Sequence, residues 1–188
     1  MSRLLRLLQR FTKPTDVKRF HSPFAVEFDP STVSKSVKAN LRKNIELLGG
    51  IEKKHIPQIY ETALSSVLAG RDHRSLVAAL VRIEGMPQDR AWEITRNLHN
   101  KATEQINRER QSSLGITHAI WMYANAPCMK DPSHPTETEI QQDAAHKAAD
   151  GKRYDLSKGL LVNGKWTRPG VEEGCKCTSR AVLPWTKE

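Results

Sequence analysis

The sequence predicts an α+β protein in three parts: an extended basic arm over residues 1–29, an α-helical region over 30–114 and a small irregular β unit over 115–188. The first 43 residues contain ten lysines and arginines against three acidic residues, which sets the N-terminal end apart. Apolar residues then recur at steps of three and four as far as Ser113, the spacing of helices that bury one face. After Gly115 the period changes and turn residues become frequent, which predicts short strands.

Residues 1–12 predict a short amphipathic helix, with leucines and Phe11 on one stripe and arginines on the other side. Because a helix of about three turns is marginal alone, it needs a surface from its own domain, a partner or a membrane; a transit peptide is a further alternative. Residues 13–29 contain two prolines and little periodicity, which predicts an extended arm. Basic clusters of this size often stay solvated. The candidate contacts to a partner protein or to nucleic acid are Arg3, Arg6, Arg10, Lys13, Lys18 and Arg19.

Four helices are predicted in the second part. Asp29 is a suitable N-cap for the first, with Pro30 at its first helical position and Gly49-Gly50 at its end. Short connections favour antiparallel packing of neighbours. The predicted helices cover about residues 29–48, from 56 or 57 to 69, 73–84 and 87–113.

The third part predicts strands with one short helix between them. Asn163-Gly164 suits a type I′ turn inside a hairpin over residues 160–167. Further strands are expected over 118–123 and 178–183, and a short helix over 143–149. The unit has too few apolar residues to be stable by burial alone, so a bound metal would supply the missing stabilisation.

The metal prediction rests on cysteine placement. Cys175 and Cys177 are one residue apart, so in an extended segment both side chains point to the same side. A structural zinc ion takes four nitrogen or sulfur ligands, and Cys128 with His146 would complete the set, with His134 as the alternative histidine.

The competing interpretations are a disulfide or inert buried thiols. With three cysteines a disulfide leaves one over, and no stretch at the N-terminus resembles a cleaved secretory signal, so a reducing compartment is expected. A hydrolytic metal site would keep one ligand position open and add a carboxylate base, and no carboxylate is singled out by the pattern. We therefore expect a closed structural site.

The other histidines and the aromatic residues receive simpler predictions. Polar surroundings predict that His21, His55, His73 and His99 are exposed. The small core of the β unit is expected to contain Trp121, Tyr154, Trp166 and Trp185.

The ordered motifs of the C-terminal half resemble a known family. In order they are Trp121, Cys128, His146 five residues before Gly151, then Lys158-Gly159, Pro169-Gly170 and the closing Gly174-Cys175-Lys176-Cys177. This order is similar to the C-terminal signature of the phage head morphogenesis family, the Mu F-like minor head proteins, and the resemblance covers about residues 75–184. Lys176 stands where arginine is usual in the family, and residues 130–142 look like an insertion.

The resemblance implies a minor head protein of a tailed bacteriophage or prophage and not an enzyme. It implies several copies in a virion, at the portal vertex or capsid interior, after assembly in the host cytoplasm. The implied partners are the portal protein, the major capsid protein and packaged double-stranded DNA, and a formal net charge of +9 fits an anionic partner.

Two other function classes remain open at this stage. One is a metal-dependent hydrolase, or a nuclease or toxin-like domain; the other is a DNA-binding regulator with a zinc module, for which no recognition helix is apparent. No apolar run approaches the ~18 residues of a membrane span, so no span is expected.

Overall fold

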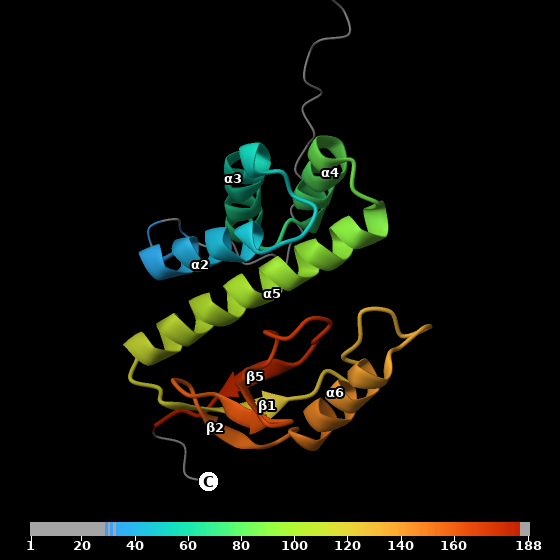
Figure 1. Ribbon diagram of the computed structural model, residues 1–188. Helices are drawn as coiled ribbons and strands as arrows, with labels where there is room; N and C mark the ends of the chain where they lie inside the picture. The colour runs from blue at the N-terminus through green and yellow to red at the C-terminus, as the bar shows by residue number, and fades with distance from the viewer. Residues whose placement is uncertain (1–28, 30, 32, 185–188) are drawn as a thin grey trace, which may run out of the picture.

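The computed structural model describes residues 29, 31 and 33–184, and over that range the chain is α+β, as predicted. Helices α2 (Lys35–Glu46), α3 (Ile56–Leu68) and α4 (His73–Glu84) gather at one end (Figure 1). The long helix α5 (Gln88–Ser113) crosses beneath them, and the strands and α6 lie on its other side. All six basic residues predicted as arm contacts lie outside the described residues.

The first described helix begins later than predicted. Ser34 caps it, since its side-chain oxygen accepts a hydrogen bond from the Val37 backbone N–H at 3.1 Å. Asp29, the predicted cap, accepts from the Ser31 N–H at 2.8 Å in a local turn instead. Both residue types are good caps, so composition alone did not distinguish them.

The next three helices match the predicted ranges to within a residue. Asp72 caps α4 through the Ser75 N–H, and Gly85 ends that helix with a φ of +62°, a conformation that glycine adopts without strain. A short 3₁₀ turn, η2 (Lys53–His55), leads into α3. The predicted stripe of α5 is buried throughout: Ala91, Ile94, Leu98, Ala102 and Ile106.

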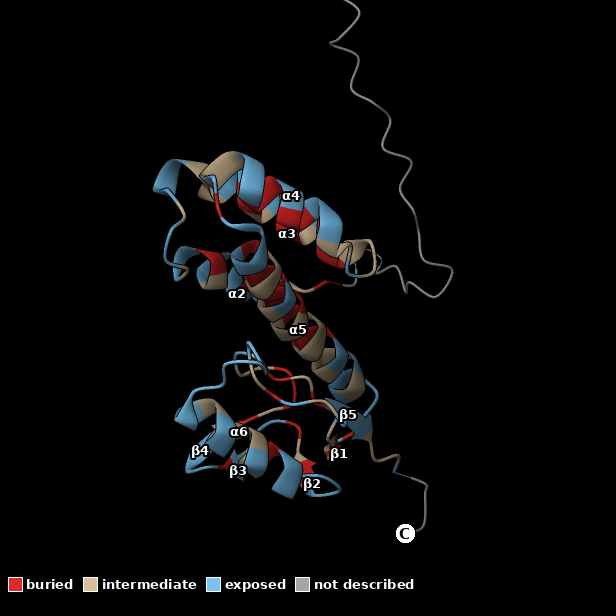
Figure 2. Ribbon diagram, turned by 90° about the vertical axis from the view of Figure 1, so that its right-hand side faces the viewer, coloured by how far each residue is buried: buried red, intermediate tan, exposed pale blue. Residues whose placement is uncertain are grey.

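Two apolar clusters hold the helices together. Figure 2 shows buried residues on the sides of α3, α4 and α5 that face one another. The larger cluster is centred on Ile59, Leu76 and Leu80, which are fully buried. A smaller one joins Val33 and Val37 to Ile106 near the other end of α5.

The C-terminal unit is built on an antiparallel sheet with strand order β2-β1-β5. A separate hairpin pairs β3 with β4, and Asn163 and Gly164 at its turn have φ values of +50° and +76°, as a type I′ turn requires. The strands are β1 (His118–Met122), β2 (Arg153–Asp155), β3 (Leu160–Val162), β4 (Lys165–Thr167) and β5 (Thr178–Ala181).

Helix α6 (Glu137–Ala148) is longer than the short helix predicted from residue 143. Thr136 and Glu139 form a reciprocal capping box, in which each side chain bonds the other residue's backbone N–H. The segment that resembles an insertion therefore contains the first half of this helix.

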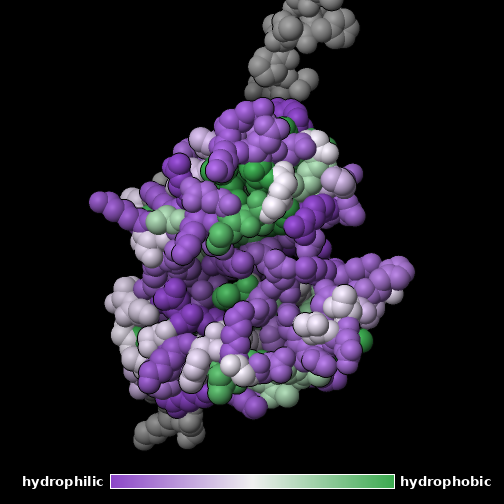
Figure 3. Space-filling view, viewed as in Figure 1, coloured by the Kyte–Doolittle hydropathy of each residue, from purple (hydrophilic) through white to green (hydrophobic). Residues whose placement is uncertain are grey.

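The described surface is mainly polar. In Figure 3, hydrophilic residues cover much of the seam between the helices and the C-terminal unit, and apolar residues gather above it. Within the described ranges, no helix is both long and apolar enough to cross a membrane.

Candidate metal centre

Four buried side chains from three separate segments meet inside the C-terminal unit. Cys128 follows β1, His146 lies on α6, and Cys175 and Cys177 precede β5. Each offers a donor atom, and these atoms all lie within 4.8 Å of one another. The residues are at most 4% exposed. The arrangement is compatible with a structural metal site, and it contains the predicted ligands.

The three cysteines are free thiols. The Sγ atoms of Cys128 and Cys177 are 3.5 Å apart, well beyond the ~2.05 Å of a disulfide bond. Backbone N–H groups also point at the sulfurs: Gly170 donates to Cys175 Sγ at 3.3 Å and Lys176 to Cys128 Sγ at 3.5 Å. Such donors stabilise thiolates that bind a metal.

The thiols influence one another's ionisation. Hydrogen bonds from Cys175 and Cys177 lower the pKa of the Cys128 thiol. The hydrogen bond to Cys128, followed by burial, raises the pKa of Cys177 to about 11. The Cys175 pKa is raised by its hydrogen bonds to Cys128 and Cys177 and by burial. One thiolate is therefore favoured, and ionising all three needs a cation among them.

His146 enters the cluster from α6. Its ring lies 5.2 Å from the Trp121 ring, centroid to centroid, which holds it against the core. Its Nδ1 atom is buried without a hydrogen-bond partner among the described residues. Buried polar atoms are rarely left unpaired. The imidazole also offers a nitrogen within 4.8 Å of all three sulfurs, and its hydrogen bond helps to lower the pKa of the Cys128 thiol, so His146 fits a metal ligand.

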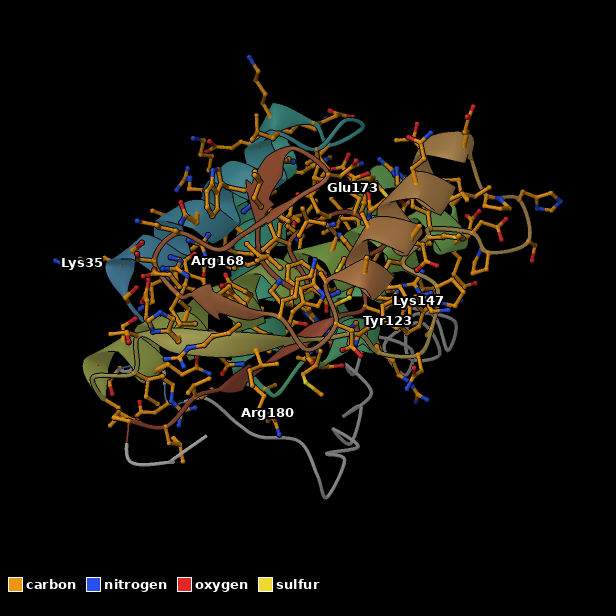
Figure 4. All side chains as sticks on the ribbon, turned by 90° about the horizontal axis from the view of Figure 1, so that it is seen from below. Lys35, Tyr123, Lys147, Arg168, Glu173 and Arg180 are labelled. Atoms are coloured by element: carbon orange, nitrogen blue, oxygen red, sulfur yellow. The ribbon has the colours of Figure 1, made fainter. Side chains whose placement is uncertain are left out.

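Other side chains of α6 fix the loops that carry the cysteines. Asp143, one turn before His146, accepts hydrogen bonds from the Cys128 N–H at 2.7 Å and the Tyr123 hydroxyl at 2.9 Å. Tyr123 lies beside the C-terminal half of this helix (Figure 4). Burial and the Asp143 bond raise its pKa to about 12. Gln142 donates to the Glu173 carbonyl at 2.9 Å, so α6 contacts both cysteine-bearing segments.

Sequence reasoning singled out no carboxylate and so missed this supporting role of Asp143. A signal was present: the Thr136-to-Glu139 spacing of a capping box marks the helix start. A helix drawn from that point places Asp143 and His146 three residues apart, on one face.

The alternative histidine lies outside the cluster. The His134 side chain is 86% exposed and its Nδ1 pairs with Asp131 Oδ2 at 3.1 Å. Asp131 also accepts from the Ser133 N–H, which forms a tight surface turn. This turn directs His134 toward solvent, so its assignment as the alternative ligand is wrong.

Several predictions about burial are also corrected. His55 and His73 are half-buried rather than exposed. His99 is fully buried, with its Nε2 2.7 Å from Ser66 Oγ, and burial lowers its pKa to about 3. Trp166 is 60% exposed, whereas Trp121 and Tyr154 are buried as predicted. Trp185 lies outside the described residues.

A second group of possible metal ligands lies where η2 meets the end of α4. Donor atoms of Glu52, His55 and Glu84 lie within 4.8 Å of one another. Lys54 pairs with Glu52 at 2.7 Å and His55 with Glu84 at 3.0 Å. These pairs already satisfy the carboxylates, so the group fits an ion-pair network that fastens η2 to α4.

No family model, curated protein or solved structure matches the chain.

Proposed function

We propose that the cluster of Cys128, His146, Cys175 and Cys177 binds a structural zinc ion. Three sulfurs and one imidazole form a common structural zinc set, and Zn–S bonds of about 2.3 Å place sulfurs about 3.8 Å apart in a tetrahedron. The Cys128 and Cys177 sulfurs are 3.5 Å apart. The donors therefore need little movement to enclose the ion.

A closed site favours a structural role over hydrolysis. Four protein ligands leave no open position for water. The nearby carboxylate of Asp143 is held by the Cys128 N–H and the Tyr123 hydroxyl. The metal-dependent hydrolase or nuclease therefore stays the weaker alternative.

The wider function proposed is that of a minor head protein of a tailed phage or prophage, acting at the portal or in the capsid interior. The proposal is supported by one coincidence: five of the residues that carry the resemblance, Trp121, Cys128, His146, Cys175 and Cys177, lie together at this cluster. Trp121 packs on His146, and the closing motif supplies two of the thiols. The expected partners are the portal or major capsid protein and packaged DNA.

Elemental analysis of purified protein tests the zinc. We expect one zinc per chain in the wild type and in His134→Ala, and weaker binding in His146→Ala, measured by competition with a chromophoric chelator. The His134 variant is a matched control because it removes an exposed imidazole from the same unit. Metal-free wild-type protein, or equal zinc affinity in both variants, contradicts the assignment.

Particles from a host that carries the coding region test the head role. Mass spectrometry of purified heads should detect the chain, and its deletion should reduce the yield of DNA-filled heads. Its absence from particles together with an unchanged yield contradicts the proposal. Metal-dependent cleavage of DNA or RNA by the pure protein, abolished in His146→Ala, would favour the hydrolase.

A further inference from the structure

A cleft of about 420 Å³, lined mainly by polar residues, lies where the helical part meets the C-terminal unit. One wall comes from the turn before α4 and from the face of α5 below it. The other comes from Lys176 to Ser179, the segment that leads from the cysteines into β5. The cleft therefore depends on both halves of the fold.

Positive charge in the cleft is not neutralised by carboxylates. Arg71 and Arg96 line it, and neither forms an ion pair within the described part of the chain. Burial lowers the pKa of Arg71, and burial with the charges of Arg71 and Arg96 lowers that of His73. Arg71 and Arg96 therefore lie close enough to His73 for their charges to disfavour its protonated form.

The single acidic residue in the lining is already engaged. Glu104 Oε1 lies 3.2 Å from Arg108 Nε and 3.8 Å from Arg168 Nε. Burial still raises its pKa. Because these arginines occupy Glu104, the charges of Arg71 and Arg96 are available to a ligand.

Arg71 is held in place by a chain of hydrogen bonds. Its backbone has a φ of +72°, a left-handed conformation that a non-glycine residue adopts at a cost of roughly 1 kcal/mol or more. Its guanidinium donates to Asn100 Oδ1 at 2.5 Å, and Asn100 Nδ2 donates to the Cys175 carbonyl at 3.2 Å. Asn100 thereby joins Arg71 to a residue of the metal cluster.

Uncharged donors complete the lining. The Thr103 hydroxyl oxygen is buried and has no hydrogen-bond partner among the described residues. Thr103 lines the cleft with Asn107, Thr178 and Ser179. Because the Thr103 oxygen is enclosed, the donors open to a ligand are the Asn107 amide and the Thr178 and Ser179 hydroxyls, whose residues are exposed.

We propose that this cleft binds the phosphate group of a ligand, held by Arg71 and Arg96 with hydrogen bonds from the hydroxyl and amide groups beside them. Guanidinium groups match phosphate oxygens in charge and geometry. A free phosphate or nucleotide and the backbone of a nucleic acid share this chemistry. The site does not require the head-assembly role.

Titration of the full zinc-loaded chain with inorganic phosphate, and separately with a short DNA duplex, tests the site. We expect saturable phosphate binding that weakens about tenfold or more in Arg96→Gln and in Arg71→Gln, because each removes charged hydrogen bonds. Arg82→Gln is the matched control: it removes the same charge from the exposed face of α4 and should change affinity less than about twofold. Zinc content and melting temperature establish that each variant folds.

The two titrations separate the sources of phosphate. Loss of duplex binding in the Arg71 and Arg96 variants but not in the control assigns the site to a nucleic-acid backbone. Phosphate binding that needs both arginines, with duplex binding unchanged, assigns it to a free phosphate or nucleotide. No saturable binding of phosphate, or equal affinity in all variants, overturns the proposal.

Discussion

The helical part and the C-terminal unit of this chain reach stability by different means. The helical part buries a continuous set of large aliphatic side chains, among them Ile45, Ile59 and Leu80, on helices of 12 to 26 residues. The C-terminal unit has strands of 3 to 5 residues, and its buried cluster includes all three cysteines. The comparison shows that long helices with aliphatic side chains form the first core, whereas short strands and a buried cysteine cluster form the second.

The contacts between the two parts are polar, whereas each part has an apolar core of its own. Their seam is polar: Asn100 bonds the Cys175 carbonyl, and Lys130 of the C-terminal unit pairs with Glu93 of α5 at 3.6 Å. Exposed ion pairs contribute little to stability. The C-terminal unit therefore gains only modest support from α5 and relies on its own centre.

Removal of the metal should separate the two parts most clearly. Chelation, or Cys177→Ser, is expected to unfold the C-terminal unit, because structural zinc supplies about 10–16 kcal/mol of apparent binding free energy. Amide NMR signals of β1, β2 and β5 should lose their dispersion while those of α2 to α4 keep theirs. Restored signals on zinc addition are the control, and a C-terminal unit that stays folded without metal would contradict the comparison.

A cavity in the helical core should destabilise the helical part and leave the C-terminal unit folded. Leu80→Ala is expected to cost about 3–5 kcal/mol of the helical part's unfolding free energy, since Leu80 is fully buried in its larger cluster. Val81→Ala, on the same helix but 38% exposed, should cost less than about 1 kcal/mol. Urea unfolding followed by far-UV circular dichroism measures both, and zinc affinity should be unchanged; a loss of zinc in Leu80→Ala would show that the parts are coupled.

Acid should destabilise the helical part through His99. Its pKa is about 3 when folded and near 6.5 when unfolded, so the unfolded chain binds the proton more readily between these values. Stability is therefore full above pH 6.5 and falls as the pH drops toward 3, by about 2–3 kcal/mol at pH 4.5. The measurement is urea unfolding of α3 and α4 at pH 7 and 4.5.

His99→Gln is the comparison variant for this measurement. Glutamine keeps a hydrogen-bond donor for Ser66 but has no titrating group. The variant should therefore lack the loss of about 2–3 kcal/mol between pH 7 and pH 4.5. An acid response of the Cys128, His146, Cys175 and Cys177 cluster cancels in this comparison because both proteins contain the same cluster. Equal pH dependence in the two proteins would contradict the role of His99.

A glycine beside the metal centre sharpens the comparison on a finer scale. Gly174 has a φ of +72°, and a Cβ there would lie 2.7 Å from the Met129 carbonyl carbon. Gly164 has a φ of +76° with open space around it. Gly164→Ala should cost about 1 kcal/mol from backbone strain alone, and Gly174→Ala about 2 kcal/mol or more because the chain must also move.

Thermal melting with a zinc-affinity measurement distinguishes these two variants. Only Gly174→Ala should weaken zinc binding, since the displaced backbone carries Cys175. Equal melting temperatures and zinc affinities would mean that the close approach to Met129 is not needed.

The amino-acid sequence by itself determined the features that depend on near neighbours. Asp72 and Gly85 delimit α4, and Asn163-Gly164 sets the hairpin turn. The spacing of Cys175 and Cys177 also predicted the cluster, because two cysteines one residue apart point to the same side of an extended segment.

Only the tertiary structure decided which equivalent candidates were used. Ser34 rather than Asp29 caps the first helix, His146 rather than His134 joins the cysteines, and His99 is buried despite polar neighbours in sequence. The cleft between Arg71 and Lys176 is set by contacts across the seam. The physical reason is that capping and turn preferences act over a few residues, whereas burial and ligand proximity depend on which distant segments pack together.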